Sequence, residues 1–390
     1  MKRSSSIAII GGGIAGLVSA IALRKKGFHP IVYEQVSDLK PVGAGVILSI
    51  NAIKALSRLG LAEILIKKGR PVYTLKIKDT AGACLSSTDL HYLSQKTGCP
   101  SVGLARSSLH DVLINALPAD SVRLGSEFEG LIQNTNQVEL SFKSQPPIYA
   151  DIAIGADGLR SKVRNALFGH VALRYSGQTS WRGIAEFPNL ESTEFSETWG
   201  IGRRFGIVPI SASNSYWYAG LNAPASDTRV PQLINKHSLM QMFGSWADPI
   251  PEIINATQDQ DIIQTDIFDT EPTDHWFDGS VVLLGDSVHS TTPNLGQGAG
   301  MAIESALTLA QAIATHDTLE HAFSSYKSSR KKRTDWITQQ SRLFGQLAQL
   351  DSPTLCKLRN WVLGVSSIVI PKAIQDRSPG QLFNYEVPFY

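Results

Sequence analysis

The sequence has few cysteines, little excess charge and no long apolar run. Its 390 residues include only Cys84, Cys99 and Cys356, with no Cys-x-x-Cys spacing. This usage argues against structural disulfides and zinc and is typical of a reducing compartment. A formal net charge of +2 gives no reason to expect nucleic acid or an acidic membrane as a partner. A small-molecule partner is therefore expected.

No segment is long and apolar enough to cross a membrane. The apolar run that ends at Leu23 is interrupted by glycines, which indicates a strand turning into a helix rather than a signal peptide, so we expect a cytoplasmic protein. The stretch from Trp361 to Ile370 stops at Pro371, well short of the ~20 residues of a membrane helix. Burial of this terminal helix is favoured over lipid contact, and no stable membrane insertion is expected.

The composition, 43% hydrophobic and 18% charged, is that of a globular protein, without repeats or low-complexity linkers. An apolar run at 6–10, a turn at 11–16, a helix at 17–26 and a second run at 30–33 predict a βαβ unit. The same patterns predict helices at 51–59 and 61–68, strands at 72–77, 150–155 and 280–284, a helix after Arg106 capped by Ser107, a β-rich stretch at 175–269, and helices from about Ala299.

The opening loop has the spacing of a dinucleotide site. In Gly11-x-Gly13-x-x-Gly16 the first glycine permits a tight turn, Gly13 lets the backbone approach a pyrophosphate, and Gly16 allows close helix packing. The helix N-terminus then offers unpaired N–H groups to the phosphates. Glu34, 21 residues after Gly13, can accept hydrogen bonds from both ribose hydroxyls.

Two further segments follow predicted strands. Asp157-Gly158-x-x-Ser161-x-x-Arg164 would be an ordinary turn on its own. Gly285-Asp286 begins 274 residues after Gly11, and Pro293, Gly296 and Gly298 then precede a helix. There, a carboxylate can bind a ribityl hydroxyl, and the helix N-terminus can stabilise negative charge on a reduced flavin. The distant Gly-Asp segment therefore points to flavin among the dinucleotides.

Together these segments, with Arg106 before a helix and Tyr326-x-x-x-Arg330-x-x-Arg333, resemble the class A FAD-dependent aromatic hydroxylases of the para-hydroxybenzoate hydroxylase-like fold, over about residues 6–345. The stretch from Ser290 to Gly298 is most similar to the branch with urate hydroxylase, zeaxanthin epoxidase and salicylate hydroxylase-like enzymes. The resemblance implies an α/β fold: a Rossmann-like FAD-binding domain of the glutathione reductase type (1–72, 101–174 and 270–350), a β-rich substrate domain (73–100 and 175–269), and a C-terminal helical tail (351–390).

The resemblance also implies the chemistry. NADH or NADPH would bind transiently and reduce FAD, O2 would add to it, and a C4a-hydroperoxyflavin would hydroxylate a small aromatic or heteroaromatic substrate. Pro293 would lie near the reacting carbon and Arg106 would contact FAD. The expected cofactor-binding residues are Gly11, Gly13, Ile14, Ala15, Gly16, Glu34, Gly45, Val46, Arg106, Asp157, Gly158, Gly285, Asp286, Pro293, Gly296, Gln297, Gly298 and Ala299.

The substrate side departs from the family pattern. Urate hydroxylase-like enzymes have an aspartate after the proline, thought to assist substrate deprotonation, whereas this chain has Asn294, and an amide cannot be a general base. Ile50-Asn51 and Gly300 differ as well. Arg204 and Tyr216 stand at positions that resemble that enzyme's substrate contacts. Arg182, Arg204, Tyr216 and Asn294 are the expected substrate-binding residues; Arg204, Tyr216 and Pro293 are the expected catalytic ones.

Other features have structural interpretations. The aromatics of the middle stretch are expected in a sheet core, and His289 in a packing or hydrogen-bonding role. The run from Arg330 to Arg333 is interpreted as a solvated helix face, with no metal site expected anywhere. Monomer and homodimer both remain open. Two other functions stay open: a related flavoprotein that epoxidises or oxidises a polyene or other lipid, and a FAD-binding protein without turnover.

Overall fold

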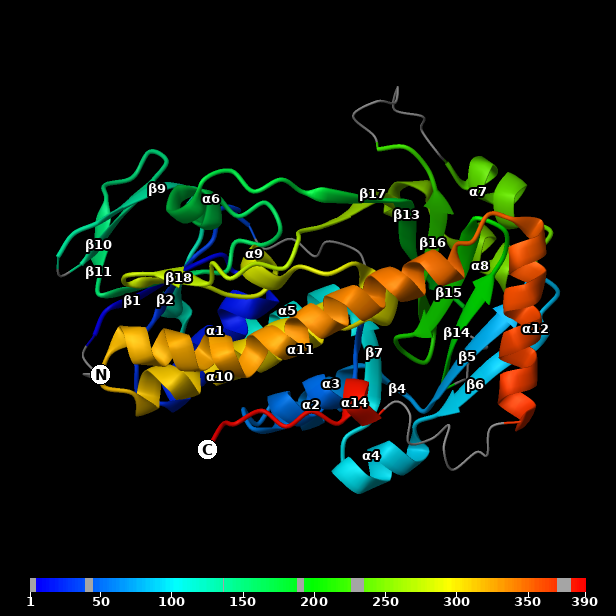
Figure 1. The fold of residues 1–390 in the computed structure, drawn as a ribbon, viewed down its shortest axis with the longest axis horizontal. Helices are drawn as coiled ribbons and strands as arrows, with labels where there is room; N and C mark the ends of the chain where they lie inside the picture. The colour runs from blue at the N-terminus through cyan, green and yellow to red at the C-terminus, as the bar shows by residue number, and fades with distance from the viewer. Residues whose placement is uncertain (1–4, 39–44, 136, 188–192, 226–234, 370–379) are drawn as a thin grey trace.

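A computed structural model describes residues 5–38, 45–135, 137–187, 193–225, 235–369 and 380–390. Among these residues the strands form four sheets, of six, seven, three and three strands. The two large sheets lie at opposite ends of the elongated molecule, and the long helix α11 (Leu319–Ala348) runs between them (Figure 1).

The six-stranded sheet builds the nucleotide-binding end. Its strand order is β18-β19-β12-β1-β2-β8, and every neighbouring pair is parallel except β18 with β19. All four residues of β1 are buried, as expected for a central parallel strand covered on both faces. The bounds are β1 Ile7–Ile10, β2 Ile31–Tyr33, β8 Val122–Arg123, β12 Ile152–Gly155, β18 Phe277–Asp278 and β19 Val281–Leu283.

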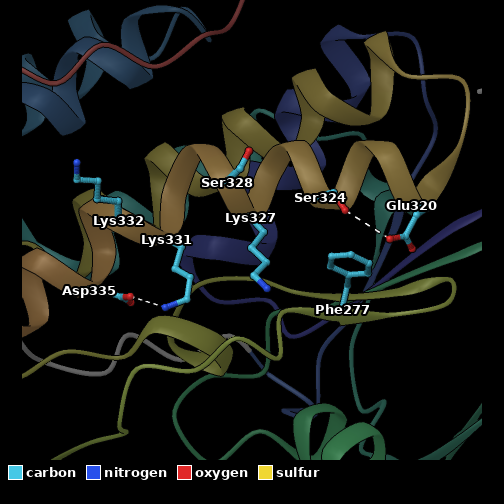
Figure 2. Close-up of a pocket in the computed structure, with 8 residues that line it drawn as sticks. All are labelled: Phe277, Glu320, Ser324, Lys327, Ser328, Lys331, Lys332 and Asp335. Carbon is cyan, nitrogen blue, oxygen red and sulfur yellow. Dashed lines mark hydrogen bonds and ion pairs between the residues drawn. The ribbon is translucent and has the colours of Figure 1, made fainter.

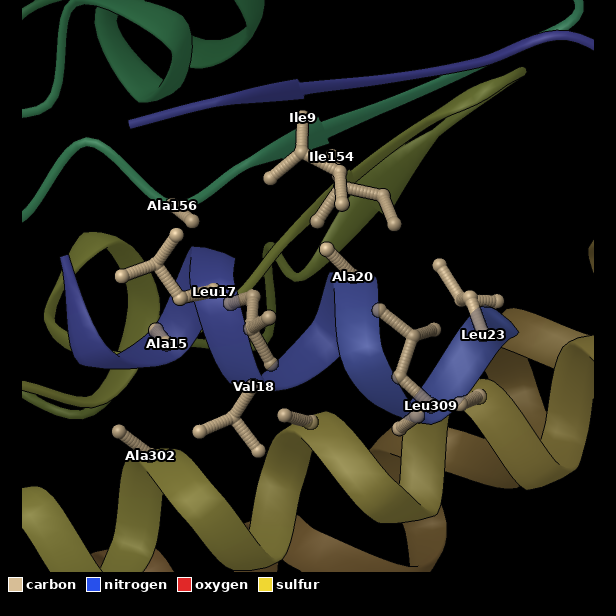
Figure 3. Packing of buried hydrophobic residues seen from close by; sticks show 14 of the residues in the cluster. Ile9, Ala15, Leu17, Val18, Ala20, Leu23, Ile154, Ala156, Ala302 and Leu309 are labelled. Atoms are coloured by element: carbon tan, nitrogen blue, oxygen red, sulfur yellow. The ribbon is translucent and has the colours of Figure 1, made fainter. Parts of the chain in front are cut away.

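Helix α1 (Ile14–Lys25) packs between this sheet and helix α10 (Gly298–Thr315). Figure 3 shows Val18 of α1 on the side of Ala302 of α10, and Ala20 of α1 below the sheet residue Ile154. Complete burial of Leu or Val side chains stabilises the fold by about 1.5–3 kcal/mol each. The helix begins at Ile14, three residues before the expected start, because Gly13 has an extended backbone and already serves as its N-cap.

The seven-stranded sheet forms the other end, in the order β17-β13-β16-β15-β14-β5-β6. Trp181, Phe205 and Trp217 are fully buried, and the last two stack with ring centroids 5.4 Å apart. The interpretation of these aromatics as sheet core is therefore confirmed. The bounds are β5 Thr74–Asp79, β6 Cys84–Asp89, β13 Arg174–Glu186, β14 Glu194–Trp199, β15 Arg203–Pro209, β16 Asn214–Asn222 and β17 Ile263–Asp269, with helices α7 Lys236–Phe243 and α8 Ile250–Ala256 packed beside them.

Two small sheets and several helices complete the body. The expected strand at 72–77 is divided at Tyr73, and the helix after Arg106 begins at Arg106 itself, with Ala105 rather than Ser107 at its N-cap. The remaining bounds are β3 Gly45–Leu48, β4 Arg70–Val72, β7 Ser101–Ala105, β9 Phe128–Gln133, β10 Val138–Phe142, β11 Ile148–Ala150, α2 Ile50–Ser57, α3 Ala62–Lys68, α4 His91–Thr97, α5 Arg106–Asn115 and α6 Lys162–Phe168.

The run from Arg330 to Arg333 is not a uniformly solvated face. Arg330 and Arg333 both bind the buried Glu304 carboxylate, at 2.6 and 2.9 Å, whereas Lys332 is exposed. The expectation was wrong because these two arginines lie on the side of α11 that packs against α10. A buried carboxylate requires such partners.

The C-terminal part has two helices, α12 (Pro353–Val369) and α14 (Gly380–Phe383). Helix α12 lies at the edge of the molecule beside β6 (Figure 1). Trp361 is 65% exposed, and Leu358, Val362 and Val365 are exposed as well. The expected burial of this helix is therefore wrong for the side chains described here. No helix in the described ranges is both long and apolar enough to cross a membrane.

Candidate active site

A cavity of ≈ 930 Å³ lies between the segments that follow β1, β12 and β19 of the six-stranded sheet and residues of the seven-stranded sheet. Sixteen of the residues expected at the site border it, and these come from segments throughout the chain: Gly13, Ile14, Ala15, Gly45, Val46, Arg106, Gly158, Arg182, Arg204, Tyr216, Asp286, Pro293, Asn294, Gly296, Gly298 and Ala299. The fold thus brings most of the predicted cofactor and substrate residues to one chamber.

A second hollow, on the outer face of α11, contains none of these residues. Figure 2 shows its lysines on the helix surface, where Lys331 points toward Asp335 and Ser324 toward Glu320. Lys331 lies 2.6 Å from Asp335, and Lys327 lies 3.5 Å from Asp274. This hollow is therefore a surface of local ion pairs, and the chamber between the sheets is the candidate active site.

The glycine loop has the backbone geometry that its sequence predicted. Gly11 has φ +106°, and a Cβ there would lie 2.4 Å from the carbonyl oxygen of Ala156. A Cβ on Gly16 would lie 1.9 Å from the carbonyl oxygen of Gly11, so α1 can pass this close only with glycine. Gly13 borders the chamber, with nothing within 4 Å of the Cβ position. The first turn of α1, with no side-chain cap, therefore presents its N–H groups to the chamber.

Two predicted carboxylates support the loops beside the chamber. Glu34 accepts a hydrogen bond from the Gly12 N–H at 2.6 Å. Asp157 accepts from the Ser161 hydroxyl at 2.5 Å and from the Val163 N–H at 3.0 Å, at the start of α6. Burial raises the pKa of Asp157, and these hydrogen bonds oppose the shift. Glu34 and Asp157 do not border the chamber, and neither do Gly11, Gly16, Gly285 and Gln297.

The segment from Gly285 to Gly298 reaches the chamber through a turn and the starts of two helices. Gly285 (φ +70°) precedes α9 (Asp286–His289), and a Cβ at Gly285 would lie 2.8 Å from that of Ala15. The Asp286 side chain is accessible from the chamber, although the surrounding protein desolvates it. Burial raises the pKa of Asp286, and the nearby Arg106 opposes this. Helix α10 also starts here without a side-chain cap.

Buried amides fix the start of α10. Gln297 donates to the Ser49 hydroxyl at 2.8 Å and accepts from the Asn51 amide at 3.2 Å. Asn51 also donates to Glu304 at 2.7 Å. The Gln297 side chain therefore holds the helix start against α2, and Gly298 and Ala299 border the chamber instead.

On the substrate side, Arg204 is buried in a polar network. Its guanidinium lies 3.2 Å from the Glu197 carboxylate and donates to the Asn294 side-chain oxygen. Tyr218 donates to Glu197 at 2.8 Å. Burial, and then the Glu197 charge, raise the pKa of Tyr218 well above its usual value. The positive charge of Arg204 is thus neutralised by a carboxylate of the chain.

Tyr216 lies on the same wall of the chamber, two residues from Tyr218 on β16. A Cβ on Gly45 would lie 2.3 Å from the Tyr216 ring, so glycine lets the two strands meet. Burial raises the pKa of Tyr216, and Arg182 and Arg106 oppose the shift. The phenol therefore stays protonated at neutral pH and can donate a hydrogen bond.

The chamber also has walls that the sequence analysis did not predict. Glu197 and Tyr218 complete the polar network, and alternation along β16 gave one signal, because positions 216 and 218 share a face of the sheet. The others come from strands, loops and helices that only the fold brings together. The apolar members are Ile47, Leu75, Ile77, Leu90, Phe195, Val208, Ile267, Phe268, Leu295, Trp336, Phe344, Leu382 and Phe383.

His289 is buried outside the chamber and binds the Ser305 hydroxyl at 2.9 Å. Burial, and then the Arg330 charge, lower its pKa to about 3. The ring is therefore neutral at physiological pH, consistent with the packing and hydrogen-bonding role expected for it.

The family profile described as "FAD binding domain" matches residues 4–341. The chain belongs to this FAD-binding family. It is 34% identical over 368 residues to aurachin C monooxygenase/isomerase of Stigmatella aurantiaca, covering 94% of this chain and 96% of the relative. It is 30% identical over 385 residues to 2-heptyl-3-hydroxy-4(1H)-quinolone synthase of Pseudomonas aeruginosa, covering 97% of each. FAD-dependent urate hydroxylases and zeaxanthin epoxidases also match, which confirms the resemblance in the sequence.

Solved structures show the same architecture. The structure of Klebsiella pneumoniae HpxO complexed with FAD and uric acid matches with a TM-score of 0.87 and 26% identity, covering 95% of this chain and 96% of that one. The expected α/β fold, with its FAD-binding part, β-rich part and C-terminal helices, is therefore confirmed. The protein is a FAD-dependent monooxygenase, an oxidoreductase of a family in which NAD(P)H is the typical transient cofactor.

The chamber fits FAD on its own evidence. The uncapped starts of α1 and α10 suit the pyrophosphate and an electron-rich flavin ring, and Arg106 adds a positive charge beside Asp286. Gly13 leaves space where a side chain would block the phosphates.

Proposed function

We propose that this protein uses NAD(P)H and O2 to hydroxylate a neutral heteroaromatic ring of the 4(1H)-quinolone class that carries an apolar side chain. Substrate C–H, O2, NAD(P)H and a proton would give substrate C–OH, NAD(P)⁺ and water. Bound FAD would supply the activation of O2 after its reduction by NAD(P)H. The chain's own residues would bind and orient the ring and exclude water.

The observation that carries this proposal is the buried Arg204–Glu197 pair. An anionic substrate is best bound by an arginine whose charge is free for a bidentate contact. Here the pair, together with Tyr218 and Asn294, presents both donors and acceptors without net charge. A 4(1H)-quinolone matches this pattern, because its ring N–H donates and its carbonyl accepts.

The apolar walls of the chamber support the proposal that the substrate carries an apolar side chain. Leu75 and Ile77 from β5, Phe195 from β14 and Phe344 from α11 border the same chamber as Arg204. Such a lining would bury an alkyl or prenyl chain and keep water from the reacting ring. Two relatives that match nearly the full length of the chain have names that include a 4(1H)-quinolone or aurachin C.

Roles for the individual residues follow. Tyr216, protonated at neutral pH, would donate to the ring carbonyl, and Arg204 with Asn294 would orient the ring. Pro293, in the turn before α10, would border the reacting carbon. We also propose that the chamber's substrate side belongs to the domain formed by 73–100 and 175–269, because Leu75, Arg182 and Tyr216 come from those ranges.

The test measures NADH and NADPH oxidation by the FAD-loaded protein under ¹⁸O₂, with products read by mass spectrometry. The panel contains 2-alkyl-4(1H)-quinolones from methyl to nonyl, phenols, indoles, purines and aromatic acids. The proposal expects one labelled oxygen in a quinolone product. It also expects kcat/KM to rise by up to about fourfold per added methylene, from ~0.8 kcal/mol of burial each.

Arg182 supports one alternative substrate class. It is half-buried, borders the chamber and contacts the Ser180 hydroxyl only at 3.5 Å, so its charge could bind an aromatic carboxylate. Labelled product from salicylate or anthranilate, lost in Arg182→Met, would favour this alternative and contradict a neutral substrate. NAD(P)H oxidation that gives only hydrogen peroxide with every compound would contradict both.

A further inference from the structure

Helix α12 is attached to the body by its polar side. Arg359 is 5% exposed, and its guanidinium donates to the carbonyl oxygens of Ala348 at 3.0 Å and Leu347 at 3.2 Å. The same guanidinium stacks on Trp199, 5.1 Å from the ring centroid. Cys356, also buried, contacts the Leu350 carbonyl oxygen at 3.1 Å. The Arg359 guanidinium and the Cys356 thiol therefore face inward.

The opposite side of α12 is apolar and faces outward. Leu355, Leu358, Trp361, Val362 and Val365 recur at helical spacing and are 37–65% exposed. We call these five residues the α12 face. A surface helix normally has the reverse orientation, with apolar residues inward. The tryptophans of the sheet core show the contrast, because Trp181, Trp199 and Trp217 are at most 1% exposed.

The segments that bind Arg359 also carry exposed apolar side chains. Arg359 contacts the carbonyl oxygen of Gly200 at 3.4 Å, and the next residue, Ile201, is 50% exposed. Leu347, whose carbonyl also binds Arg359, is 41% exposed. Five exposed apolar side chains on one face of a helix, as in α12, indicate an interaction site.

We propose that the α12 face binds to the surface of an anionic lipid bilayer, with the helix lying parallel to the membrane. The charge of the helix favours lipid over a protein partner. Residues 353–369 contain no Asp or Glu, and Lys357 is exposed beside the face, whereas Arg359 is buried. An outward tryptophan beside an exposed lysine is typical of interfacial membrane binding, whereas lysine is depleted in protein interfaces.

The position of α12 gives this binding a consequence for the enzyme. The helix packs against β6, and Ser86 and Thr88 of that strand border the chamber. A bilayer at the α12 face would therefore lie one strand away from the chamber wall. An apolar substrate dissolved in the lipid would be close to the active site.

The first experiment is flotation of the FAD-loaded full-length protein with vesicles of equal parts phosphatidylglycerol and phosphatidylcholine, and with phosphatidylcholine alone. The wild type is expected to float with the anionic vesicles. The double variant Leu358→Ser/Trp361→Ser is expected to bind about tenfold less, because two buried apolar side chains are lost. Ile132→Ser is the matched control, since Ile132 is 59% exposed on β9, at the other end of the molecule (Figure 1).

Two further measurements sharpen the test. Lys357→Gln should weaken binding about fivefold on anionic vesicles and leave binding to neutral ones unchanged. Tryptophan emission should shift to shorter wavelength with vesicles, and Trp361→Phe should abolish the shift. Unchanged flavin absorbance shows that each variant is folded.

Three outcomes would overturn the proposal. The first is failure of the wild type to float with anionic vesicles, and the second is a double variant that floats as well as the wild type. The third is a wild type that does not bind vesicles but sediments as a dimer, together with a double variant that sediments as a monomer. The α12 face would then be an interface between two copies of the chain. None of these readouts depends on the substrate, so they are separate from the test of the proposed function.

Discussion

The Arg204 guanidinium lies 3.2 Å from the Glu197 carboxylate and also donates to the side-chain oxygen of Asn294. Both members of the ion pair are almost completely buried, with side chains 2% and 6% exposed. The pair therefore contributes to the fold and to the electrostatics of the chamber at once, and the two effects can be measured separately.

Replacing Glu197 with glutamine should destabilise the protein by about 3 kcal/mol, because it leaves a buried cation without its counter-charge. Glu194→Gln on the same strand is the control. Its pairs with Lys76 and Lys78 are partly exposed, so its loss should cost no more than about 1 kcal/mol. Urea unfolding followed by circular dichroism measures both. Equal costs would show that the Arg204–Glu197 pair is not a buried charge pair in solution.

Gly345 of α11 controls the position of Asn294. A Cβ there would lie 2.1 Å from the Asn294 amide nitrogen, which donates to the Ser341 carbonyl at 2.8 Å. Gly345→Ala should therefore displace the amide from Arg204 and raise the KM for substrate about tenfold, ~1.4 kcal/mol, the loss of about one hydrogen bond. Alanine favours a helix by up to about 1 kcal/mol, so stability should not fall in parallel. Gly130→Ala, with open space at its Cβ, should change neither quantity.

The two glycines of the first loop should respond differently to alanine. Gly16→Ala places a Cβ 1.9 Å from the Gly11 carbonyl oxygen, so the FAD-free protein should lose about 2 kcal/mol or more. Gly13→Ala meets no protein atom within 4 Å and should leave the FAD-free protein unchanged. It should nevertheless weaken FAD binding about tenfold or more, because the new methyl group occupies the space in which the FAD pyrophosphate would approach the backbone. Thermal unfolding and FAD titration distinguish these results; equal losses of stability would contradict them.

Acid should destabilise the protein in two steps. His289 has a folded pKa lowered to about 3 from the usual 6.5, so the unfolded chain binds a proton first and stability falls as the pH drops below about 6.5. The pKa of Glu304 is lowered overall, since Arg330 and Arg333 outweigh the effect of its burial. Its contribution is present above pH 4.5, its usual pKa, and is lost as the pH falls further through the lowered value.

Unfolding free energies between pH 8 and pH 4 test this assignment. His289→Gln should reduce the slope of the unfolding free energy against pH between about pH 6.5 and pH 4.5. The loss of stability below pH 4.5, assigned to Glu304, should remain in this variant. A wild-type slope that persists unchanged in the variant would show that another group titrates in this range.

The sequence predicted the cofactor side of the chamber because short-range spacing determines it. The turn at Gly11, the close packing at Gly16 and the uncapped start of α1 all follow from residues within one βαβ unit. The Gly285-Asp286 segment was assigned to the cofactor side of the chamber from the resemblance to the flavin hydroxylases. In the structure, parallel pairing of β12 with both β1 and β19 brings this segment to the same sheet edge as the glycine loop.

The substrate side could not be predicted in the same way. Glu197 meets Arg204 only because β14 and β15 pair in antiparallel register, and Phe344 and Phe383 reach the chamber from distant helices. Burial of α12 was expected from its apolar composition, yet Arg359 turns its polar side inward by binding carbonyl groups of another segment. Side-chain direction in these cases depends on long-range contacts, which local patterns do not contain.

The central position of β1 constrains how the chain matures during synthesis. Among the strands of its sheet, β1 is translated before all others; its neighbour β2 follows closely, but its other neighbour β12 comes about 140 residues later and β19, at Val281–Leu283, later still. Closing such long loops carries an entropic cost, and domains rich in distant contacts fold slowly. Helix α10, which covers α1, is translated after all of them. One edge of β1 can therefore pair with β2 early, but its other edge stays open until β12 has been translated, and the nucleotide pocket closes only after α10 has been made.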